Sequence, residues 1–263
     1  MQPRTALEGT PSDDSPDILA TGRTDITLIM ISMTARHPDG LDAQYIEWHA
    51  LDHQPEMHRL ASVRASLRLV STPTCRAARA AGEGVYDSVD HVMTYFFVDL
   101  DALEPFDVLN AATAEAGRTP YLRGERLSGP LPGMPFLDRG LFGLKGTVAA
   151  PRIKVGGDVL PWWPALGVYL LLERGEASPA DLTEVPGVGG AWWANGIRAE
   201  PPYATSDHSG LQVTYCFLDG DPPEIGERLR PALEKRWADS GITPLLAAPF
   251  HTIVRYDWAR HLP

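Results

Sequence analysis

The sequence has only two cysteines, Cys75 and Cys216, among its 263 residues. Two thiols cannot form a disulfide framework, and no C-x-x-C spacing indicates a zinc site or a redox pair. We assign no role to Cys75. Such sparse use of cysteine fits a reducing compartment, so we expect a cytoplasmic protein.

Basic residues are also scarce, because 23 Lys and Arg stand against 34 Asp and Glu, for a net charge of -11. This is the wrong sign for a phosphate backbone or an anionic membrane surface, so we expect neither as a partner. The apolar run at 166–172 is much shorter than the roughly 18 residues of a membrane span. The acidic, proline-containing start offers no signal-peptide core, and we predict that residues 1–23 form a disordered tail.

An internal repeat determines the predicted fold. The segment 94–104 (TYFFVDLDALE) shares its Thr-Tyr start, one Phe, two Asp and the final Glu with the segment 214–224 (TYCFLDGDPPE). We infer two copies of one structural plan. Tyr95 and Tyr215 match across the copies, so we expect both to be structural.

Hydrophobic patterning in the first copy predicts a strand at 26–33, a helix at 41–59 and strands at 62–71 and 91–98. The order of these elements is β-α-β-β. An Asp followed three residues later by Glu, the spacing of a capping box, then precedes an amphipathic segment in both copies. These Asp residues are Asp101 and Asp221, and the helices that follow them should end near residues 117 and 240.

A closing strand completes each copy, most clearly at 250–258, and gives the βαββαβ unit of a ferredoxin-like fold. We therefore predict an α+β fold in which two ferredoxin-like repeats pack sheet to sheet. The first repeat is expected at 24–150, a linker at 151–164 and the second repeat, with a shortened first helix, at 165–263. The Gly- and Pro-rich stretch between the halves should carry an extra strand around 141–148.

The densest cluster of polar and aromatic side chains is the sequence YIEWHALDHQPEMH. His49 and His53 are four residues apart, so both project from one face of the helix. Tyr45 lies one turn earlier and Asp52 lies beside them. Pro55 lacks a backbone donor and should end or kink this helix.

The E-W pair at 47–48, the D-H-Q-P run at 52–55 and the apolar turn leading to Ala65 and Arg68 resemble EthD-like members of the dimeric α+β barrel superfamily. Residues 185–191 (VPGVGGA) keep part of this pattern in the second copy. The resemblance implies a barrel of two facing sheets, built here by internal duplication, with pockets between sheet and helices. Members of the superfamily include cofactor-free monooxygenases, dehydratases, cyclases, muconolactone isomerases and haem enzymes.

In the EthD-like family the His of this motif points toward the pocket, which implies that role for His53, with Asp52 and Trp48 beside it. The second copy has no equivalent His, so we expect one such site per chain. As catalytic residues we predict His53, His49 and Asp52, since an imidazole suits acid–base work near neutral pH. Tyr45 and Trp48 are predicted substrate contacts. Alternatively, His53 only hydrogen-bonds the kinked backbone.

Three further residues are predicted to bind substrate. Arg68 either pairs with Asp52 or binds a substrate carboxylate, and pairing is the simpler interpretation. Successive strand side chains face opposite ways, so one of Trp192 and Trp193 should enter the barrel interface and the other a helix-side pocket. The alternative for both is structural packing.

The run HALDH from His49 to His53 is close to the zinc-binding H-x-x-E-H helix, but no third ligand stands out. A haem would need a proximal His and an apolar pocket. We therefore predict no cofactor. His208 and His251 receive no role.

These residues and the resemblance together favour a cofactor-independent lyase, isomerase or oxygenase with His53 as general acid or base. The expected partner is a small aromatic, steroid or polyketide-like molecule, and the expected state is a monomer or homodimer. The alternative is a non-catalytic ligand-binding or assembly protein with the same barrel. A metal- or haem-dependent enzyme is a third, less favoured interpretation.

Overall fold

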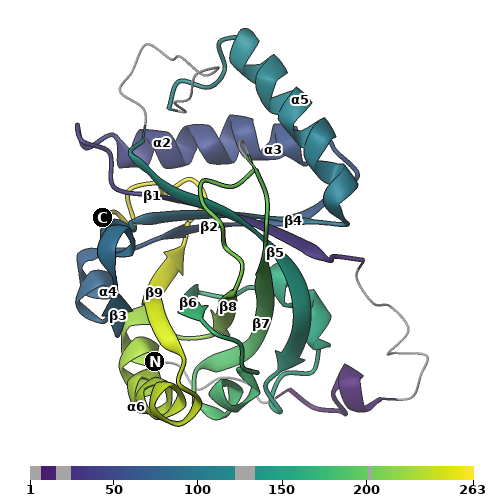
Figure 1. The fold of residues 1–263 in the computed structure, drawn as a ribbon, viewed down its shortest axis with the longest axis vertical. Coiled ribbons are helices and arrows are strands. Elements are labelled where there is room, and N and C mark those ends of the chain that lie inside the picture. Colours follow the sequence, from purple (N-terminus) through teal and green to yellow (C-terminus); the bar gives the residue numbers. More distant parts are fainter. Residues whose placement is uncertain (1–6, 16–24, 122–133, 201–202) are drawn as a thin grey trace.

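Two βαββαβ repeats face each other and form one barrel (Figure 1). The computed structural model describes residues 7–15, 25–121, 134–200 and 203–263. The strands of the first repeat are β1 (Leu28–Thr34), β2 (Val63–Val70), β4 (His91–Phe97) and β5 (Phe136–Ala149). Its helical segments are α2 (Asp42–Trp48), the π-helical η2 (His49–His53), α3 (Gln54–Met57) and α5 (Leu103–Glu115).

The second repeat has the same order of strands but a reduced first helix. Its elements are β6 (Gly167–Arg174), η6 (Ala180–Glu184), β7 (Val188–Ile197), β8 (Leu211–Leu218), α6 (Pro222–Ser240) and β9 (Thr243–Thr252). The first helix is only the short 3-10 turn η6, as the short connection predicts. The connecting elements are η1 (Ser12–Asp14), α4 (Pro73–Ala77), β3 (Ala81–Gly82), η3 (Gly84–Ser88), η4 (Leu100–Ala102) and η5 (Gly157–Trp162).

Strand pairing confirms the predicted fold class. Each repeat has the antiparallel ferredoxin-like order, β2-β4-β1-β5 in the first and β7-β8-β6-β9 in the second. The long strand β5 joins the repeats by pairing with β7 from Leu141↔Ile197 to Ala149↔Gly190. The other seam, between β2 and β9, has only the pairs Leu69↔Thr252 and Val70↔His251. The result is a dimeric α+β barrel formed within one chain and closed more weakly on one side.

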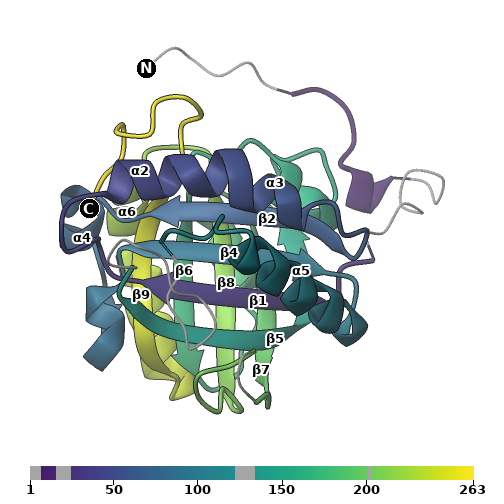
Figure 2. The ribbon, with the colours of Figure 1, turned by 90° about the horizontal axis from the view of Figure 1, so that it is seen from above.

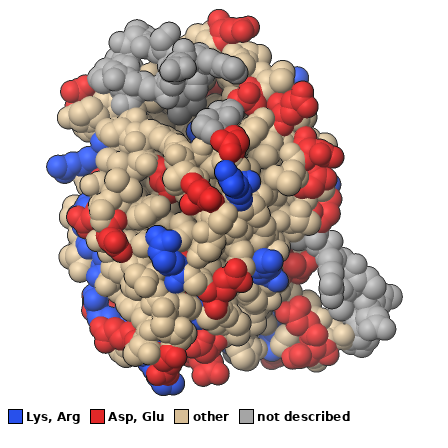
Figure 3. Space-filling view, in the orientation of Figure 1, with Lys and Arg blue, Asp and Glu red and all other residues tan. Residues whose placement is uncertain are grey.

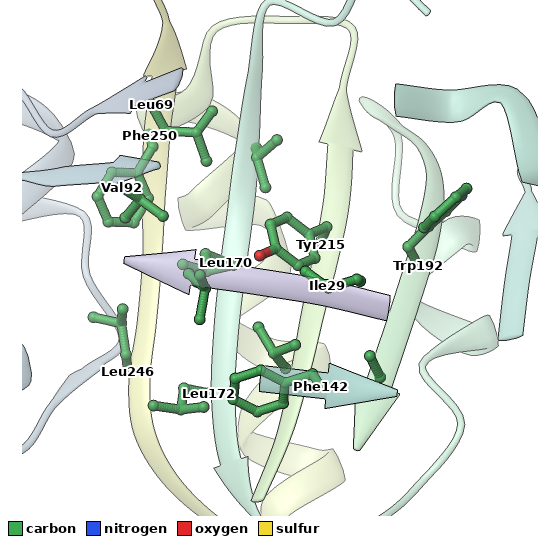
Figure 4. Close-up of a cluster of buried hydrophobic side chains, with 14 of the residues drawn as sticks. Ile29, Leu69, Val92, Phe142, Leu170, Leu172, Trp192, Tyr215, Leu246 and Phe250 are labelled. Atoms are coloured by element: carbon green, nitrogen blue, oxygen red, sulfur yellow. The ribbon is translucent and has the colours of Figure 1, made fainter. Parts of the chain in front are cut away.

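The barrel interior is filled by side chains from both sheets (Figure 4), including Ile29, Phe142, Leu170 and Trp192. Strands of the first repeat cross those of the second, and inward side chains of the two sheets form one apolar cluster. The indole Nε1–H of Trp192 donates to the Gly157 carbonyl at 2.6 Å. The interior is therefore a packed core. Full burial of each large apolar side chain stabilises the fold by about 1.5–3 kcal/mol.

The repeat alignment places Tyr95 opposite Tyr215, but the two rings face different sides of the barrel wall. Tyr215 lies inside the barrel, where its hydroxyl hydrogen-bonds Thr94 Oγ1 at 2.9 Å. Tyr95 instead lies on the outer face beneath the helices, against Phe106. A one-residue shift along a strand exchanges the faces, so a match of residue types did not guarantee a match of positions.

Helices cover the outer faces of the two sheets. The α2–η2–α3 helix and α5 lie over the first sheet, and α6 lies over the second (Figures 1 and 2). Ile225, Leu229 and Leu233 of α6 pack on Tyr169, Leu171 and other apolar side chains of the second sheet. This interface is mostly apolar, but near its C-terminal end the buried Arg236 of α6 donates to the Glu173 carboxylate of β6 at 3.1 Å. The first interface has a larger polar part.

Several predicted boundaries need correction. The closing strand is β9, Thr243–Thr252, rather than 250–258. Its prolines are tolerated because β9 pairs continuously only with β6. The extra strand predicted at 141–148 is the C-terminal part of β5. Asp99, not Asp101, caps the turn before α5, and Asp221 occupies the N-cap of α6 without a side-chain hydrogen bond.

Part of the predicted N-terminal tail is ordered. Residues 1–6 and 16–24 lie outside the described residues. In η1, the backbone N–H and the hydroxyl of Ser12 both donate to the Lys154 carbonyl at 3.0 Å. The Asp13 carboxylate accepts from the Gly157 amide at 3.3 Å. These contacts tie the turn to the connection between the repeats.

The surface carries both signs of charge. On the face shown in Figure 3, acidic and basic side chains are interspersed. In the described ranges, no helix combines the length and hydropathy needed to cross a bilayer.

A buried ion pair connects β5 to the β7–β8 loop. His208 Nε2 lies 2.9 Å from the Asp138 carboxylate, and His208 Nδ1 lies 2.9 Å from the Ser206 carbonyl. Both partners only accept, so both ring nitrogens donate and the imidazole is charged. Burial opposes that charge, but the hydrogen bond that His208 donates to Asp138 raises the pKa of His208. Burial likewise opposes the Asp138 carboxylate, but hydrogen bonds from His208 and Thr205 hold the pKa of Asp138 below its ordinary value.

Replacing His208 by Gln should lower the free energy of unfolding by about 3 kcal/mol near pH 6, because one partner of a buried pair is removed. The stabilisation from the Asp138 carboxylate is lost as the pH falls below about 4, where the carboxylate takes up a proton. The stabilisation from the charged His208 ring is lost as the pH rises above about 6.5, where the ring loses a proton. Urea unfolding of both proteins should therefore show a larger difference at pH 6 than at pH 9. A difference independent of pH would contradict a charged His208.

Candidate functional site

The candidate site is the layer between the α2–η2–α3 helix and the outer face of the first sheet. One end of this layer is apolar, with Met30, Met93 and Phe97 from the sheet packed near Met57 and Phe106 from the helices. The other end is polar and buried. It contains Arg68 of β2, His91 of β4 and the imidazoles of η2.

Pro55 produces a π-helical turn instead of a helix end. The Gln54 N–H donates to the His49 carbonyl, five residues earlier, and Pro55 follows without a donor of its own. The wider turn absorbs the missing hydrogen bond and lets the helix continue to Met57. His49 and His53 lie within this turn with their rings 5.4 Å apart, and they are 3% and 5% exposed. Single π turns of this kind are common at functional sites.

A chain of contacts holds the buried guanidinium of Arg68. Its Cζ lies 4.2 Å from the Tyr45 ring centroid, and Nη1 donates to the Tyr45 hydroxyl at 3.1 Å. Nη2 lies 3.3 Å from His91 Nδ1, and His91 Nε2 lies 2.7 Å from the Asp42 carboxylate. Arginine can only donate, so His91 Nδ1 accepts and Nε2 carries the proton that is donated to Asp42.

The charges along this chain follow from its hydrogen bonds. Burial would raise the pKa of Asp42, but hydrogen bonds from His91 and from the His37 amide hold it below its ordinary value. Burial lowers the pKa of His91 despite the hydrogen bond to Asp42. His91 is therefore a neutral bridge between a carboxylate and a guanidinium. In the described part of the chain, no carboxylate lies within ion-pair distance of Arg68 itself.

Both imidazoles of η2 are neutral at pH 7. Burial lowers the pKa of His53 to about 4. Burial and the positive charge of Arg68 place the pKa of His49 well below its ordinary value. The Trp48 ring stacks on His53 at 5.2 Å, and its indole N–H donates to the Arg118 carbonyl at 2.9 Å. Each neutral imidazole can accept a proton, but only when a nearby negative charge compensates for the cost of burying the positive charge that results.

Four buried polar atoms of this layer have no hydrogen-bond partner among the described residues. They are Nδ1 of His49, Nδ1 of His53, Nε of Arg68 and the hydroxyl oxygen of Tyr95. An unsatisfied buried polar group costs about 1–3 kcal/mol, so four in one layer need an explanation. A ligand with an anionic oxygen would supply the acceptor that Arg68 Nε and the Tyr95 hydroxyl lack. The imidazoles could then exchange a proton with it.

The structure brings together five of the predicted site residues, namely Tyr45, Trp48, His49, His53 and Arg68. Asp52 is not among them. Its carboxylate accepts from Arg118 Nη2 at 2.7 Å and Nε at 3.3 Å, so it does not hydrogen-bond either imidazole. The predicted pairing of Arg68 with Asp52 was therefore wrong, because Asp52 pairs with Arg118 instead.

Trp192 and Trp193 face opposite ways, as the strand alternation predicts. Trp192 lies in the barrel interior. Trp193 packs against Gly146 of β5, where a Cβ would collide with its ring. Neither belongs to the cluster beneath α2 and η2.

Sequence reasoning missed the partners of Arg68, above all Asp42 and His91. His91 pairs with Val70 across β2 and β4, so it is the diagonal neighbour of Arg68 on the same sheet face. Only the strand register could have shown this relation. In the described ranges, no group of three or more His, Cys, Asp or Glu side chains could hold a metal ion. Among these residues, His49 and His53 therefore have no third side chain with which to bind zinc.

No family model matches the sequence, and no curated protein matches it. Among solved structures, an anthrone oxidase-like protein is similar with a TM-score of 0.44 and 14% identity, over 88% of this chain and 92% of that chain. A chlorite dismutase mutant from Candidatus Nitrospira defluvii has a TM-score of 0.44 and 9% identity, over 89% and 94%. A dye-decolorizing protein from V. cholerae has a TM-score of 0.44 and 10% identity, over 86% and 93%. Similarity at this level does not indicate which residues of this chain act in a site.

The hydrogen-bond chain predicts one tautomer for His91. Nitrogen-15 NMR of histidine-labelled protein at pH 7 should show a neutral His91 ring with its proton on Nε2, because Nδ1 accepts from Arg68. A ring protonated on Nδ1 alone, or on both nitrogens, would contradict the chain from Asp42 to Arg68. The signal of His91 is the one that is absent from the spectrum of the His91→Phe variant.

Proposed function

We propose that this chain is an enzyme that moves a proton on a small aromatic or otherwise enolisable molecule, with His53 as general acid or base. Arg68 binds the enolate or phenolate oxygen of that molecule. The reaction is a lyase, isomerase or oxygenase reaction of the kind that the EthD-like resemblance implies. The observation that carries the proposal is the group of buried polar atoms without partners around Arg68.

The charge of Arg68 supports an anionic reaction intermediate. The guanidinium is 4% exposed, and its nearest carboxylate in the contact chain, Asp42, is reached only through His91. A fixed cation in a buried site strongly stabilises a negative charge that develops beside it, because little water screens the interaction. Substrate deprotonation produces such a charge on oxygen.

The low pKa of His53 fits a base that acts only with its substrate. A pKa of about 4 keeps the imidazole neutral and ready to accept a proton at pH 7. The burial that disfavours the imidazolium is offset once an oxyanion forms nearby, so the two charges appear together. His49, whose ring lies 5.4 Å away, is a second acceptor for the same proton.

The apolar end of the layer suits a flat hydrocarbon body. Met30, Met93, Phe97 and Leu141 form this end of the sheet face. Trp48, stacked on His53, supplies an aromatic wall beside the reactive nitrogen. A mainly apolar site with a few polar groups is typical of sites for small organic ligands.

Hydrogen exchange in 2-tetralone, an enolisable aromatic ketone, tests this proposal. In D₂O the protein should catalyse loss of the α-proton signal in proton NMR. His53→Gln and Arg68→Met should each slow the catalysed exchange at least about 100-fold, because general acid–base and oxyanion contributions are of this size. Trp193→Phe, outside the site, is the matched control and should retain the rate.

Each outcome distinguishes between the possible functions. If the ketone binds without catalysed exchange, the non-catalytic binding alternative replaces the enzyme. If His53→Gln exchanges as fast as the unchanged protein, His53 is not the base. An absorption spectrum of the purified protein in the same series detects bound haem, which would favour the haem-dependent alternative.

A further inference from the structure

A second group of reactive side chains lies next to this site, at the α3 end of the same sheet face, and Arg68 borders both. There a cleft of about 640 Å³ opens between the helix, β2 and the chain that follows β9. Gln54 and His58 line it from the helix, Ser66 from the strand, and Tyr256 and Trp258 from the C-terminal chain. The proton chemistry of the buried site does not use these residues.

Two short hydrogen bonds meet at Ser66. The Gln54 amide Nε2 donates to Ser66 Oγ at 2.6 Å, and His58 Nε2 lies 2.6 Å from the same oxygen. Because the amide donates, the hydroxyl proton of Ser66 is free to point toward His58 Nε2, the other partner. An acceptor nitrogen at this distance is the relation of a nucleophilic serine to its general base.

The local fold explains why the three residues meet. Gln54 and His58 are four residues apart, so they project from one face of the helix. Ser66 lies two residues before Arg68 on the same outer face of β2, opposite that helix face. Partial burial lowers the pKa of His58, so its ring is neutral at pH 7 and can accept a proton. The donor from Gln54 also favours a negative charge on Ser66 Oγ.

We propose that Ser66 is a nucleophile, activated by His58, that takes the acyl group of aryl esters bound in this cleft. Ser66 Oγ forms a bond to the ester carbonyl carbon, and its proton passes to His58 Nε2. The bond from carbon to the aryl oxygen breaks, and the phenol leaves with the proton from His58. Water, deprotonated by the same imidazole, then bonds to the acyl carbon. The bond from that carbon to Ser66 Oγ breaks, the proton on His58 returns to Oγ, and the carboxylic acid leaves.

The walls of the cleft favour an aromatic leaving group. The rings of Tyr256 and Trp258 lie 5.6 Å apart, and Tyr256 is 81% exposed. Tyr256 has a φ of 63°, and in the described ranges no other non-glycine residue has a positive φ. Such a backbone costs about 1–3 kcal/mol and occurs often at ligand clamps. A flat aryl group would cover the exposed Tyr256 ring and the half-buried Trp258 ring.

Acylation by 4-nitrophenyl acetate tests the proposal. Stopped-flow absorbance should show a burst of nitrophenolate, and peptide mass mapping should place one acetyl group on Ser66. Ser66→Ala should abolish the burst, and His58→Ala should slow it at least about 100-fold. The burst rate should rise with pH to a plateau, and the midpoint of the rise should lie below pH 6.5, the ordinary pKa of histidine, because burial lowers the pKa of His58.

Two controls separate catalysis from a structural role. Ser62→Ala, a half-buried serine just before the same strand, should retain the full burst. Added imidazole should restore part of the burst to His58→Ala, which a purely structural histidine would not permit. No burst in the unchanged protein, an acetyl group at another residue, or a burst retained in Ser66→Ala would overturn the proposal.

Discussion

The buried guanidinium of Arg68 is the constraint on which the first half of the structure depends. A buried charge is costly unless it is compensated, and here the compensation comes through an intermediary. Tyr45 stacks on the guanidinium, His91 accepts from it, and Asp42 accepts from His91. Asp42 is also the first residue of α2, where the helix dipole favours a negative charge. One contact chain thus fixes both where the helix begins and how it lies on the sheet.

The two repeats solve the same packing problem in different ways. In the second repeat, α6 lies on a mostly apolar sheet face, and its buried Arg236 is compensated directly by the Glu173 carboxylate of β6. In the first repeat, the π turn brings the imidazoles of His49 and His53 together in the layer that also holds Arg68. The duplication therefore supplies a barrel from both halves, while the imidazoles and the indirectly compensated Arg68 come from the first half alone.

The sequence was sufficient for the architecture because the repeat and the hydrophobic patterns act over many residues. It also located His49, His53 and Tyr45 correctly on one helix face, since helical spacing alone decides that. The register of the strands could not be predicted from the sequence, as the opposite faces of Tyr95 and Tyr215 show. A shift of one residue moves every side chain of a strand to the other face of the sheet, and it does not change the composition of the strand.

The partners of charged side chains were equally hidden from the sequence. Asp52 stands next to His53 along the chain, but the helix turns it toward Arg118. Arg68 reaches His91 only because β2 and β4 pair in a particular register. Such contacts depend on distances between elements that a sequence pattern does not contain. For the same reason, the meeting of Ser66 with His58 became visible only in the folded chain.

The Arg68 Nε–H signal in a proton–nitrogen NMR spectrum tests the central claim most directly, because that atom has no partner among the described residues. We predict that a small aromatic anion such as 1-hydroxy-2-naphthoate moves this proton signal downfield and slows its exchange with water. The shift should saturate with the same dissociation constant as the quenching of tryptophan fluorescence. An Arg68 signal that does not change while the ligand binds elsewhere would contradict the account.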